Sequence, residues 1–251
     1  SSIFSALLSP QGKYLFDFFV IKNDRGYLLD CDGNSVKSLI DNLSKYKIRS
    51  KVEIKNMSSS YVVGIIHYEN FKMIQKELNK QAFTLHFRDS PIFVDPRDSD
   101  LGARIISPLE KLYLTIKKLN LKIVENNSYF KKAFLKGIPV EGLMSLQNQL
   151  FGLEINFEKL NAIDFKKGCY VGQENTARMK LKNKIRRQLM SIKTKKSVKI
   201  GDEIKYNDNV IGKILIDKPY PFALIKLFDP EFSVFKDKTL KINNDNAEIV
   251  S

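Results

Sequence analysis

One stretch of the chain concentrates more reactive side chains than any other, and it reads Lys166-Lys167-Gly168-Cys169-Tyr170-Val171-Gly172-Gln173-Glu174. Its two glycines, four residues apart, permit backbone conformations closed to other residues and leave the intervening cysteine with little cover. The two lysines before Cys169 favour a thiolate, the form of cysteine that attacks electrophiles and binds metals. Gln173 and Glu174 add an amide and a carboxylate within reach of the same turn. The pattern predicts an ordered loop with a reactive thiol; a glycine turn around a small buried cysteine is the alternative.

Basic residues follow this stretch at alternate positions. Arg178, Lys180 and Lys182 alternate with uncharged residues, and Arg186 comes shortly after them. On an extended strand this alternation would place every positive charge on one face. Two interpretations stay open: a solvated edge strand protected by its lysines, and a track for a polyanion such as RNA, with Tyr170 available to stack on a base or a pterin ring.

The same segment dominates the charge of the chain. Residues 159–199 hold 13 Lys and Arg against 2 Asp and Glu, in a chain whose formal net charge is +14. Positive charge this concentrated attracts a polyanion. Because lysine supplies 34 of the 42 basic residues, a general bias toward lysine on solvated surfaces explains the charge equally well.

The composition excludes several classes of protein. Hydrophobic residues make up 43% of the 251 residues, too many for a disordered chain. No apolar run approaches the ~20 residues that span a bilayer, so we expect no membrane partner. The 2 cysteines exclude a disulfide framework and a self-contained four-cysteine cluster, and we expect no permanently bound metal. Cys31 ends an apolar run and is expected to be a core residue.

The first third of the chain alternates between strand and helix patterns. Aromatic and β-branched runs bounded by turn residues indicate strands, and apolar residues at helical spacing behind Asn34 and Ser35 indicate a helix. This order predicts one antiparallel sheet with helices packed on one face, an α+β arrangement. The strands are expected over residues 14–21, 26–31, 51–57, 60–66 and 82–87, and the helices over 36–43 and 71–78.

From residue 89 onward the pattern changes. Pro91 and Pro96 predict an irregular connection, because proline disfavours helix in the residue before it. Helices are expected over 109–119 and 126–135, followed by an ordered loop over 140–175. Short apolar runs separated by turn residues then predict a small barrel or sandwich. These runs cover residues 189–192, 203–206, 210–216 and 222–227.

Residues 167–174 resemble the KGC[FY]xGQE signature of the YgfZ-like proteins, which are folate-binding relatives of the glycine-cleavage T-protein, a tetrahydrofolate-dependent aminomethyltransferase. Further motifs of this family have counterparts along almost the whole chain. They are Pro10-Gln11-Gly12-Lys13, residues 46–52, Asp95-Pro96-Arg97, Leu101-Gly102-Ala103-Arg104 and Gly137-Ile138-Pro139. The family's opening segment, similar to FLQGQxTND, is absent, so we expect part of the N-terminal module to be missing.

The resemblance implies an α+β fold of the T-protein type: a three-part ring of two mixed α/β modules and a C-terminal antiparallel β-barrel around a central folate cavity. A discontinuous folate-cavity module is expected over residues 1–13 and 89–175. A ferredoxin-like module is expected over residues 14–88, and the barrel over residues 176–251. The signature loop would lie at the mouth of the cavity.

The resemblance also implies a function, that of a tetrahydrofolate-binding accessory factor for the assembly or repair of [4Fe–4S] clusters in client enzymes, including enzymes that methylthiolate tRNA. Cys169 would be its essential thiol. Tyr129, eight positions before Gly137, would stack on the pterin of tetrahydrofolate or a one-carbon derivative. We assign no catalytic step. The other signature residues would shape and hold the loop; they are Lys167, Gly168, Tyr170, Gly172, Gln173 and Glu174.

Two other functions stay open. The first is a true aminomethyltransferase of the glycine-cleavage type, which the KGCYVGQE signature disfavours because the T-protein lacks it. The second is a basic tRNA-binding module that uses Arg178, Lys180, Lys182 and Arg186. The expected partners are folate, iron–sulfur client enzymes and tRNA, with the chain as a monomer. Because no signal or transit pattern opens the sequence, a bacterial cytoplasm is expected rather than a mitochondrial matrix.

Overall fold

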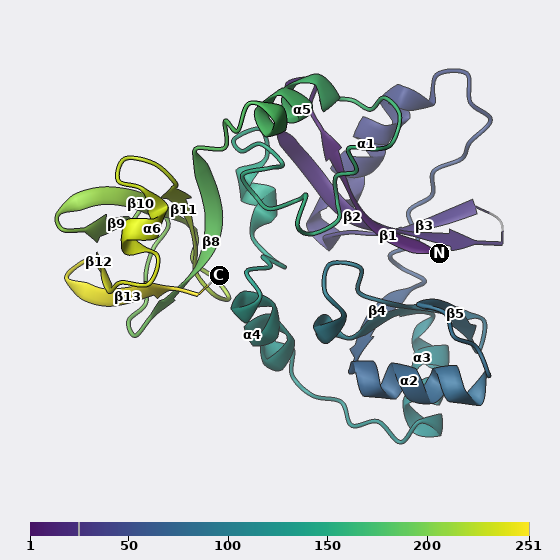
Figure 1. Cartoon of the computed structure of the whole chain (residues 1–251). Coiled ribbons are helices and arrows are strands. Elements are labelled where there is room, and N and C mark those ends of the chain that lie inside the picture. Colours follow the sequence, from purple (N-terminus) through teal and green to yellow (C-terminus); the bar gives the residue numbers. More distant parts are fainter. Residues whose placement is uncertain (25, 251) are drawn as a thin grey trace. The chain divides into compact units, whose positions relative to one another are not determined.

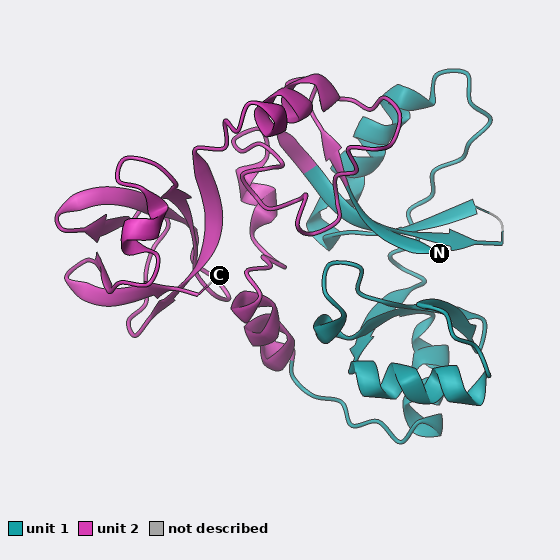
Figure 2. Cartoon of the chain, in the orientation of Figure 1, with its two compact units in different colours: residues 1–5, 16–125 teal, residues 6–15, 126–251 magenta. Residues whose placement is uncertain are grey.

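The computed structural model describes residues 1–24 and 26–250 (Figure 1). The chain forms two compact units, which Figure 2 distinguishes by colour. Unit 1 comprises residues 1–5 and 16–125, and unit 2 comprises residues 6–15 and 126–251. The chain passes between the units within strands β1 (Ser2–Leu8) and β2 (Tyr14–Asn23).

Unit 1 contains two sheets. One has the strand order β1-β2-β3, and the other is antiparallel with the order β4-β7-β6-β5. Three α-helices and two 3-10 helices connect the strands. Their bounds are β3 (Gly26–Asp30), η1 (Gly33–Ser35), α1 (Val36–Lys47), β4 (Val62–Ile66), α2 (Tyr68–Glu77), β5 (Thr84–Phe87), β6 (Ser90–Val94), η2 (Ser99–Leu101), β7 (Ala103–Ser107) and α3 (Leu109–Lys118).

The four-stranded sheet buries one face beneath α2 and α3 (Figure 1). Phe71 and Ile74 project from the same side of α2, because residues three apart share a helix face. Both are fully buried in one cluster with Ile92 of β6 and Ile105 of β7, and Leu112 of α3 packs against that cluster. The apolar residues at helical spacing in α2 and the apolar residues of the strands therefore pack together in a single layer.

Three expectations for unit 1 are wrong. The strands form two sheets rather than one. Residues 51–57 alternate like a strand but are irregular, since none of the described strands pairs with them. Residues 90–94 form β6 although Pro91 lacks an N–H group; pairing with β7 begins only at Ile92, so the missing donor costs no ladder bond on that side. The expected hairpin is confirmed by the pairing of β2 with β3, while its turn residue Arg25 lies outside the described residues.

Unit 2 contains helix α4 (Asn127–Leu135) and η3 (Leu143–Leu146), and after them a long segment that packs closely although it holds little regular structure. The Tyr14 N–H donates to the Leu150 carbonyl over 2.8 Å, and the Tyr14 ring meets Phe157 edge-on at 5.6 Å. The ordered loop expected over 140–175 is therefore present up to the start of α5 (Gln173–Leu181).

The rest of unit 2 is a closed antiparallel barrel with the strand order β10-β11-β8-β13-β12-β9. Its interior is aliphatic, with Ile192, Ile214, Ile225 and Leu240 all fully buried. Phe235 of the short helix α6 (Phe232–Phe235) joins this core with no exposed surface. The strands are β8 (Arg187–Thr194), β9 (Glu203–Tyr206), β10 (Asn209–Ile216), β11 (Phe222–Lys226), β12 (Leu240–Ile242) and β13 (Asp245–Ile249).

The expected α+β class and the C-terminal antiparallel barrel are confirmed. The four strands expected in the last 70 residues are β8, β9, β10 and β11. Within the described residues, no helix has the length and apolar character needed to cross a membrane.

Candidate functional site

The predicted signature loop lies in unit 2 and leads directly into helix α5, whose first residue is Gln173. Gly172 is the N-terminal cap of α5 and has a positive φ of 83°. Cys169, three residues earlier, is exposed and carries a free thiol. The structure therefore places this thiol on an accessible loop at the start of a helix, and not in a packed core.

The loop is held against the turn formed by residues 9–12, which belongs to the same unit. In this turn the Gly12 N–H donates to the Ser9 carbonyl over 2.8 Å. A Cβ atom on Gly172 would lie 2.5 Å from the Ser9 oxygen, closer than a carbon atom can approach. Only glycine fits here, so two motifs about 160 positions apart in sequence meet through backbone contact.

Hydrogen bonds tie the first turn of α5 to this contact. The Thr176 hydroxyl donates to the Gly172 carbonyl over 2.9 Å. The Asn175 side-chain amide donates to the Gln11 carbonyl over 3.1 Å. Gln173 closes the loop itself, because its side-chain oxygen accepts the Tyr170 N–H over 3.3 Å. The role expected of Gln173, to hold the loop by a hydrogen bond, has a contact that fits it.

Tyr170 lies beside the thiol in sequence but turns its hydroxyl inward. The Lys167 ammonium lies 5.2 Å from the centre of the Tyr170 ring, in cation–π range. The hydroxyl is buried, and among the described residues it is the buried side-chain polar atom without a hydrogen-bond partner. Burial raises the pKa of this phenol, and the negative charge of Asp164 raises it further. A buried donor left without a partner costs about 1–3 kcal/mol.

The charged residues of the loop have partners of their own. The backbone N–H of Lys166 donates to the Asp164 carboxylate over 2.8 Å, while the Lys166 side chain is exposed. Lys167 covers Tyr170. Glu174 pairs with Arg178 one helical turn later rather than with the thiol. Gly168 has no atom within 4 Å of the position of a Cβ, so no close contact requires glycine there.

The extended geometry expected for residues 178–184 is wrong. Arg178 and Lys180 lie on α5, where residues two apart point to nearly opposite sides. Arg178 pairs with Glu174, and Lys180 pairs with Glu158 over 2.7 Å. Lys182 and Arg186 follow the helix and are exposed. The alternating charges suggested a strand because α5 has too few apolar residues to show a hydrophobic pattern of helical period.

An ion pair between a buried carboxylate and a half-exposed arginine, which the sequence did not indicate, fixes the long segment to the barrel. Glu154 is only 4% exposed, and its carboxylate receives the Arg187 guanidinium over 2.9 Å. The same carboxylate accepts the Phe151 N–H over 3.0 Å, and the Glu154 carbonyl accepts the Leu189 N–H over 2.7 Å. No local pattern marks Glu154, since its partner stands 33 positions away.

Unit 1 holds a second group of buried charges that the site prediction did not include. Arg97 makes two charged hydrogen bonds to Asp95, of 3.0 and 2.7 Å, and both side chains are almost fully buried. The Arg97 and Arg104 guanidinium groups lie 4.8 and 4.5 Å from the Phe19 ring centre. Arg104 also pairs with Asp30 over 2.7 Å. These contacts give Asp95, Arg97 and Arg104, which belong to quoted family motifs, a structural role inside unit 1.

Tyr129 is half-buried on α4 and lies 5.8 Å from the ring of Phe130. A hollow beside this helix is lined by Phe130, Phe134 and Tyr220 among others, but not by Tyr129. Its volume is about 10 Å³, while pockets for small molecules hold about 300–1,000 Å³. This hollow cannot hold a pterin, and the Tyr129 ring lies partly exposed on α4 outside it.

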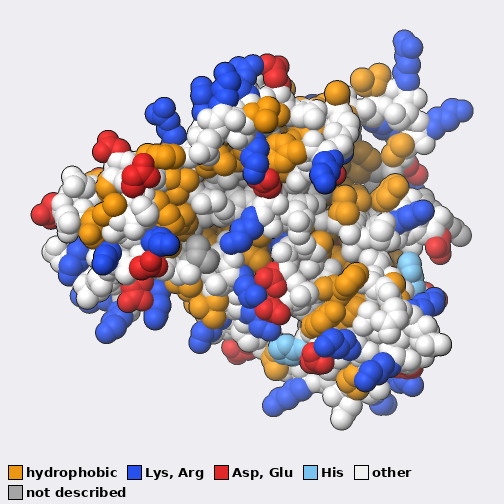
Figure 3. All heavy atoms as spheres, viewed as in Figure 1, with side chains coloured by type: hydrophobic (Ala, Val, Ile, Leu, Met, Phe, Trp, Pro, Cys, Tyr) orange, Lys and Arg blue, Asp and Glu red, His pale blue; other side chains and the backbone are white. Residues whose placement is uncertain are grey.

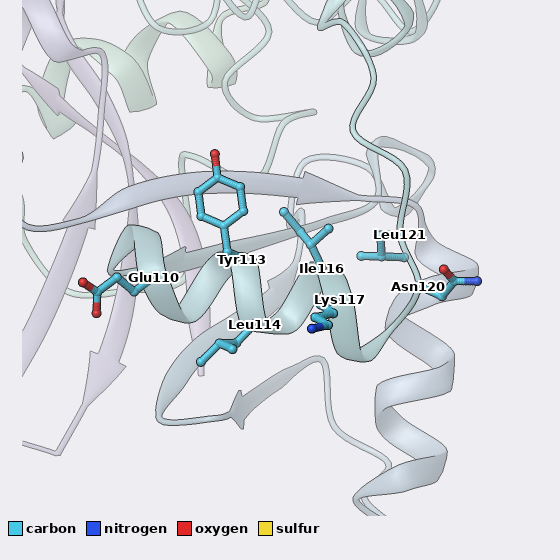
Figure 4. A pocket seen from close by; sticks show the side chains of 7 residues that line it. All are labelled: Glu110, Tyr113, Leu114, Ile116, Lys117, Asn120 and Leu121. Carbon is cyan, nitrogen blue, oxygen red and sulfur yellow. The ribbon is translucent and has the colours of Figure 1, made fainter.

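A larger hollow of about 560 Å³ lies on the surface of α3 in unit 1 (Figure 4). All seven residues that line it come from this helix and its exit, including Tyr113, Leu114 and Leu121. Figure 4 shows that Tyr113 and Leu114 point to different sides of the helix. The hollow is an open helix surface, and it contains none of the predicted site residues.

The second cysteine, Cys31, is half-buried in unit 1. Burial raises the pKa of its thiol, the hydrogen bond with Ser35 opposes that effect, and the charges of Asp30, Asp17 and Asp32 add to it. Across residues 1–24 and 26–250, no three or more His, Cys, Asp or Glu side chains converge as metal ligands. A thiol held in its neutral form is a poor nucleophile and ligand.

Two proteins with similar sequences have closely related descriptions. A Dictyostelium discoideum protein described as "Iron-sulfur cluster assembly factor IBA57 homolog, mitochondrial" is 27% identical over 233 residues, covering 81% of this chain and 56% of that protein. A Mus musculus protein described as "Iron-sulfur cluster assembly factor IBA57, mitochondrial" is 28% identical over 199 residues, covering 76% and 53%. The relatives of the present chain are thus described as mitochondrial iron–sulfur cluster assembly factors. The chain spans about half the length of these curated relatives.

The fold has a counterpart among solved structures. The crystal structure of glycine cleavage system aminomethyltransferase T from Bartonella henselae matches all of this chain and 75% of that chain with a TM-score of 0.71. The sequence identity is 13%, so the likeness shows a T-protein-type fold and no activity. No protein-family model matches the sequence.

The comparisons overturn one expectation. A bacterial cytoplasm was expected because no transit pattern opens the sequence. The named relatives, from Dictyostelium discoideum, Pyricularia oryzae and Mus musculus among others, are all mitochondrial proteins of eukaryotes. The expectation was wrong because the start of the given sequence does not decide the compartment.

Proposed function

We propose that this chain supports the assembly of iron–sulfur clusters in mitochondria and that Cys169 is the thiol through which it acts. The observation that carries the proposal is the accessible Cys169 thiol on a loop fixed by the contact of Gly172 with Ser9. The described function of the relatives and their location point the same way. A single exposed cysteine cannot hold a cluster alone, so the cluster is a cargo shared with another protein.

The proposed step is a ligand exchange. The Cys169 thiol releases its proton to solvent, and the thiolate binds one iron atom of a cluster held by a carrier, displacing a carrier thiolate that takes up a proton. A thiol of the client enzyme then loses its proton and displaces Cys169 from that iron, and the Cys169 thiolate takes up a proton again. No electron is gained or lost in this exchange, so the step needs neither an oxidant nor a reductant.

Client enzymes and folate belong to the same proposal. The clients are enzymes with [4Fe–4S] clusters, among them those that methylthiolate tRNA. Tetrahydrofolate or a one-carbon derivative binds with its pterin against Tyr129, and the T-protein-type fold supports this assignment.

The test of the thiol is complementation of eukaryotic cells that lack the corresponding mitochondrial factor. The readouts are the activity of a methylthiolating [4Fe–4S] enzyme and a melting curve of each purified variant. We expect Cys169→Ser to fold like the wild type and to restore no activity. Cys31→Ser is the matched control and is expected to restore activity fully. A Cys169→Ser variant that restores full activity would sink the proposal.

The test of folate is a calorimetric titration of the purified chain with tetrahydrofolate. The chain contains no tryptophan, so quenching of its tyrosine fluorescence provides a second signal. We expect binding that Tyr129→Ala weakens at least tenfold, while Tyr113→Ala on α3 leaves it unchanged. Equal affinity of the Tyr129→Ala variant and the wild type would reject the assigned pterin site.

A further inference from the structure

The end of helix α5 displays a group of side chains that the proposed thiol chemistry does not use. Leu181, its last residue, is 86% exposed. Lys182, Lys184 and Arg186 follow it and are exposed as well. In Figure 3 the Lys and Arg side chains gather over α5 and over the segment that leads from it, with little acidic surface among them. We call Leu181, Lys182, Lys184 and Arg186 the α5 end surface.

These side chains stand on a well-defined helix end. The Asn183 N–H donates to the Lys180 carbonyl over 3.2 Å, and the Lys184 N–H donates to the Met179 carbonyl over 2.9 Å. Asn183 has the left-handed φ of 46° that this double hydrogen bond requires. The exposure of Leu181 therefore belongs to a fixed backbone and does not come from fraying of the helix.

The positive charges of this surface have no counter-ion among the residues that the structure describes. In the described part of the chain, no ion pair involves Lys182, Lys184 or Arg186, whereas Arg178 and Lys180 earlier on the helix are paired. Lysine near the C-terminal end of a helix offsets the helix dipole. That effect accounts for Lys182, but it reaches neither Arg186 nor the exposed leucine.

We propose that the α5 end surface docks an acidic protein that delivers or receives the cluster, with Leu181 entering an aliphatic recess of that partner. The inference rests on the proposed function of Cys169. Unpaired positive charges around one exposed leucine match an interface with an apolar centre and a charged rim. The partner's carboxylates would supply counter-ions to these lysine and arginine side chains.

The placement of Cys169 agrees with such docking. The thiol lies four residues before α5, and a nine-residue helix is about 14 Å long. A protein–protein interface of ordinary size buries about 800 Å² on each partner, a patch roughly 30 Å across. One partner centred on α5 is therefore wide enough to reach from the α5 end surface to the thiol.

The structure favours a protein over RNA as the occupant. RNA binding without sequence preference combines positive charge with open aromatic rings on which bases stack. The aromatic rings next to this surface are not open, because Lys180 covers Phe165 at 6.0 Å and Lys167 covers Tyr170 at 5.2 Å. Leu181 offers a nucleic acid no stacking face but offers a protein an apolar anchor.

The experiment places the photo-crosslinking residue p-benzoylphenylalanine at position 181 of the full chain, expressed in mitochondria. The matched position is Ile200, which is 59% exposed on the barrel. Captured species are identified by mass spectrometry, and the captured protein is then purified for affinity measurements. The charge variant is Lys182→Glu/Lys184→Glu, and Lys195→Glu/Lys199→Glu is its control with the same change of charge on another exposed segment.

We expect position 181, and not position 200, to capture one acidic protein. The Lys182→Glu/Lys184→Glu variant should lose this capture, and the Lys195→Glu/Lys199→Glu variant should keep it. The purified partner should bind a Leu181→Ser variant about tenfold more weakly than the wild type. Capture of RNA, equal capture from both positions, or capture that ignores the charge reversal would each overturn the inference.

A Cys169→Ser variant separates this inference from the proposed function. Capture that persists while the client enzyme stays inactive agrees with both. If Cys169→Ser restores client activity, the proposed function fails, and the capture result alone then decides whether the surface docks a partner. If Lys182→Glu/Lys184→Glu loses capture but keeps client activity, docking plays no part in cluster delivery and the inference is wrong.

Discussion

Gly12 and Gly172 face each other across the contact between the turn of residues 9–12 and the start of α5. A Cβ atom on Gly172 would lie 2.9 Å from the Gly12 Cα, and one on Gly12 would lie 3.1 Å from the Gly172 oxygen. Both residues also have positive φ values, 80° and 83°, which side chains disfavour. Sterics and backbone conformation therefore require glycine on both sides of the joint that holds the Cys169 loop.

The first prediction concerns this joint. Gly172→Ala should lower the free energy of unfolding by about 2–4 kcal/mol, because it adds left-handed strain to a clash with the Ser9 carbonyl. Gly168→Ala is the control within the same loop and should stay within about 0.5 kcal/mol of the wild type, since nothing lies within 4 Å of its Cβ position. Urea unfolding measures both, and equal midpoints would mean that the joint yields without cost.

The contrast between Gly168 and Gly172 shows where sequence reasoning reached its limit. The signature identified the loop and its exposed thiol, but it treated the two glycines alike, since a motif carries no information on which neighbour each glycine meets. The partner of Gly172 is Gly12, which only the folded chain brings near. The same distance in sequence hid the pairing of Glu154 with Arg187.

The fold was predictable where the hydrophobic pattern was clear. Barrel strands β9 and β10 are short apolar runs bounded by turn residues, and their expected bounds agree with the structure to within one residue. β12, with 3 residues, is too short to show alternation. The alternating charges predict an extended segment over 178–184, but its first four residues lie on α5, because the polar residues of this helix show no apolar stripe and its position depends on contacts such as that of Asn175 with Gln11.

The second prediction concerns the buried hydroxyl of Tyr170. Tyr170→Phe removes a donor without a partner and keeps the ring beneath Lys167. We expect the variant to be as stable as the wild type or more stable by about 1 kcal/mol at neutral pH. Chemical denaturation measures the difference. A clear loss of stability would mean that the hydroxyl has a partner in solution.

The raised pKa of Tyr170 gives this variant a pH dependence. The unfolded chain ionises its tyrosines near pH 10, while the folded chain keeps Tyr170 protonated to higher pH. Below about pH 10 the hydroxyl is protonated in both states, so its titration leaves the free energy of unfolding unchanged. As the pH rises from there through the folded pKa, the free energy of unfolding falls, because only the unfolded chain ionises this group. Unfolding curves should show the wild type losing more stability than Tyr170→Phe above that pH. Parallel curves would contradict the burial of the hydroxyl.

The third prediction concerns the buried ion pair of Arg97 and Asp95. Arg97→Leu leaves the Asp95 carboxylate charged and without its guanidinium, so we expect a loss of about 3–5 kcal/mol of unfolding free energy. The control is Lys111→Met, which breaks an exposed pair with Asp89 and should cost at most about 1 kcal/mol. Thermal and urea unfolding compare the two, and similar small losses would mean that the buried pair is replaceable.

The fourth prediction compares the two thiols by alkylation. Cys169 is exposed, whereas Cys31 is half-buried and its pKa is raised above the usual cysteine value. In the folded protein at neutral pH, iodoacetamide should modify Cys169, the single thiol of the Cys31→Ser variant, at least tenfold faster than Cys31, the single thiol of the Cys169→Ser variant.

The alkylation rate of Cys31 should increase only at a pH above the usual cysteine range, because its thiol stays protonated to higher pH. Mass spectrometry of timed samples gives both rates, and the same reaction in urea provides the unfolded reference, where the two rates should converge. Equal rates in the folded protein would contradict the exposure difference on which the assignment of Cys169 rests.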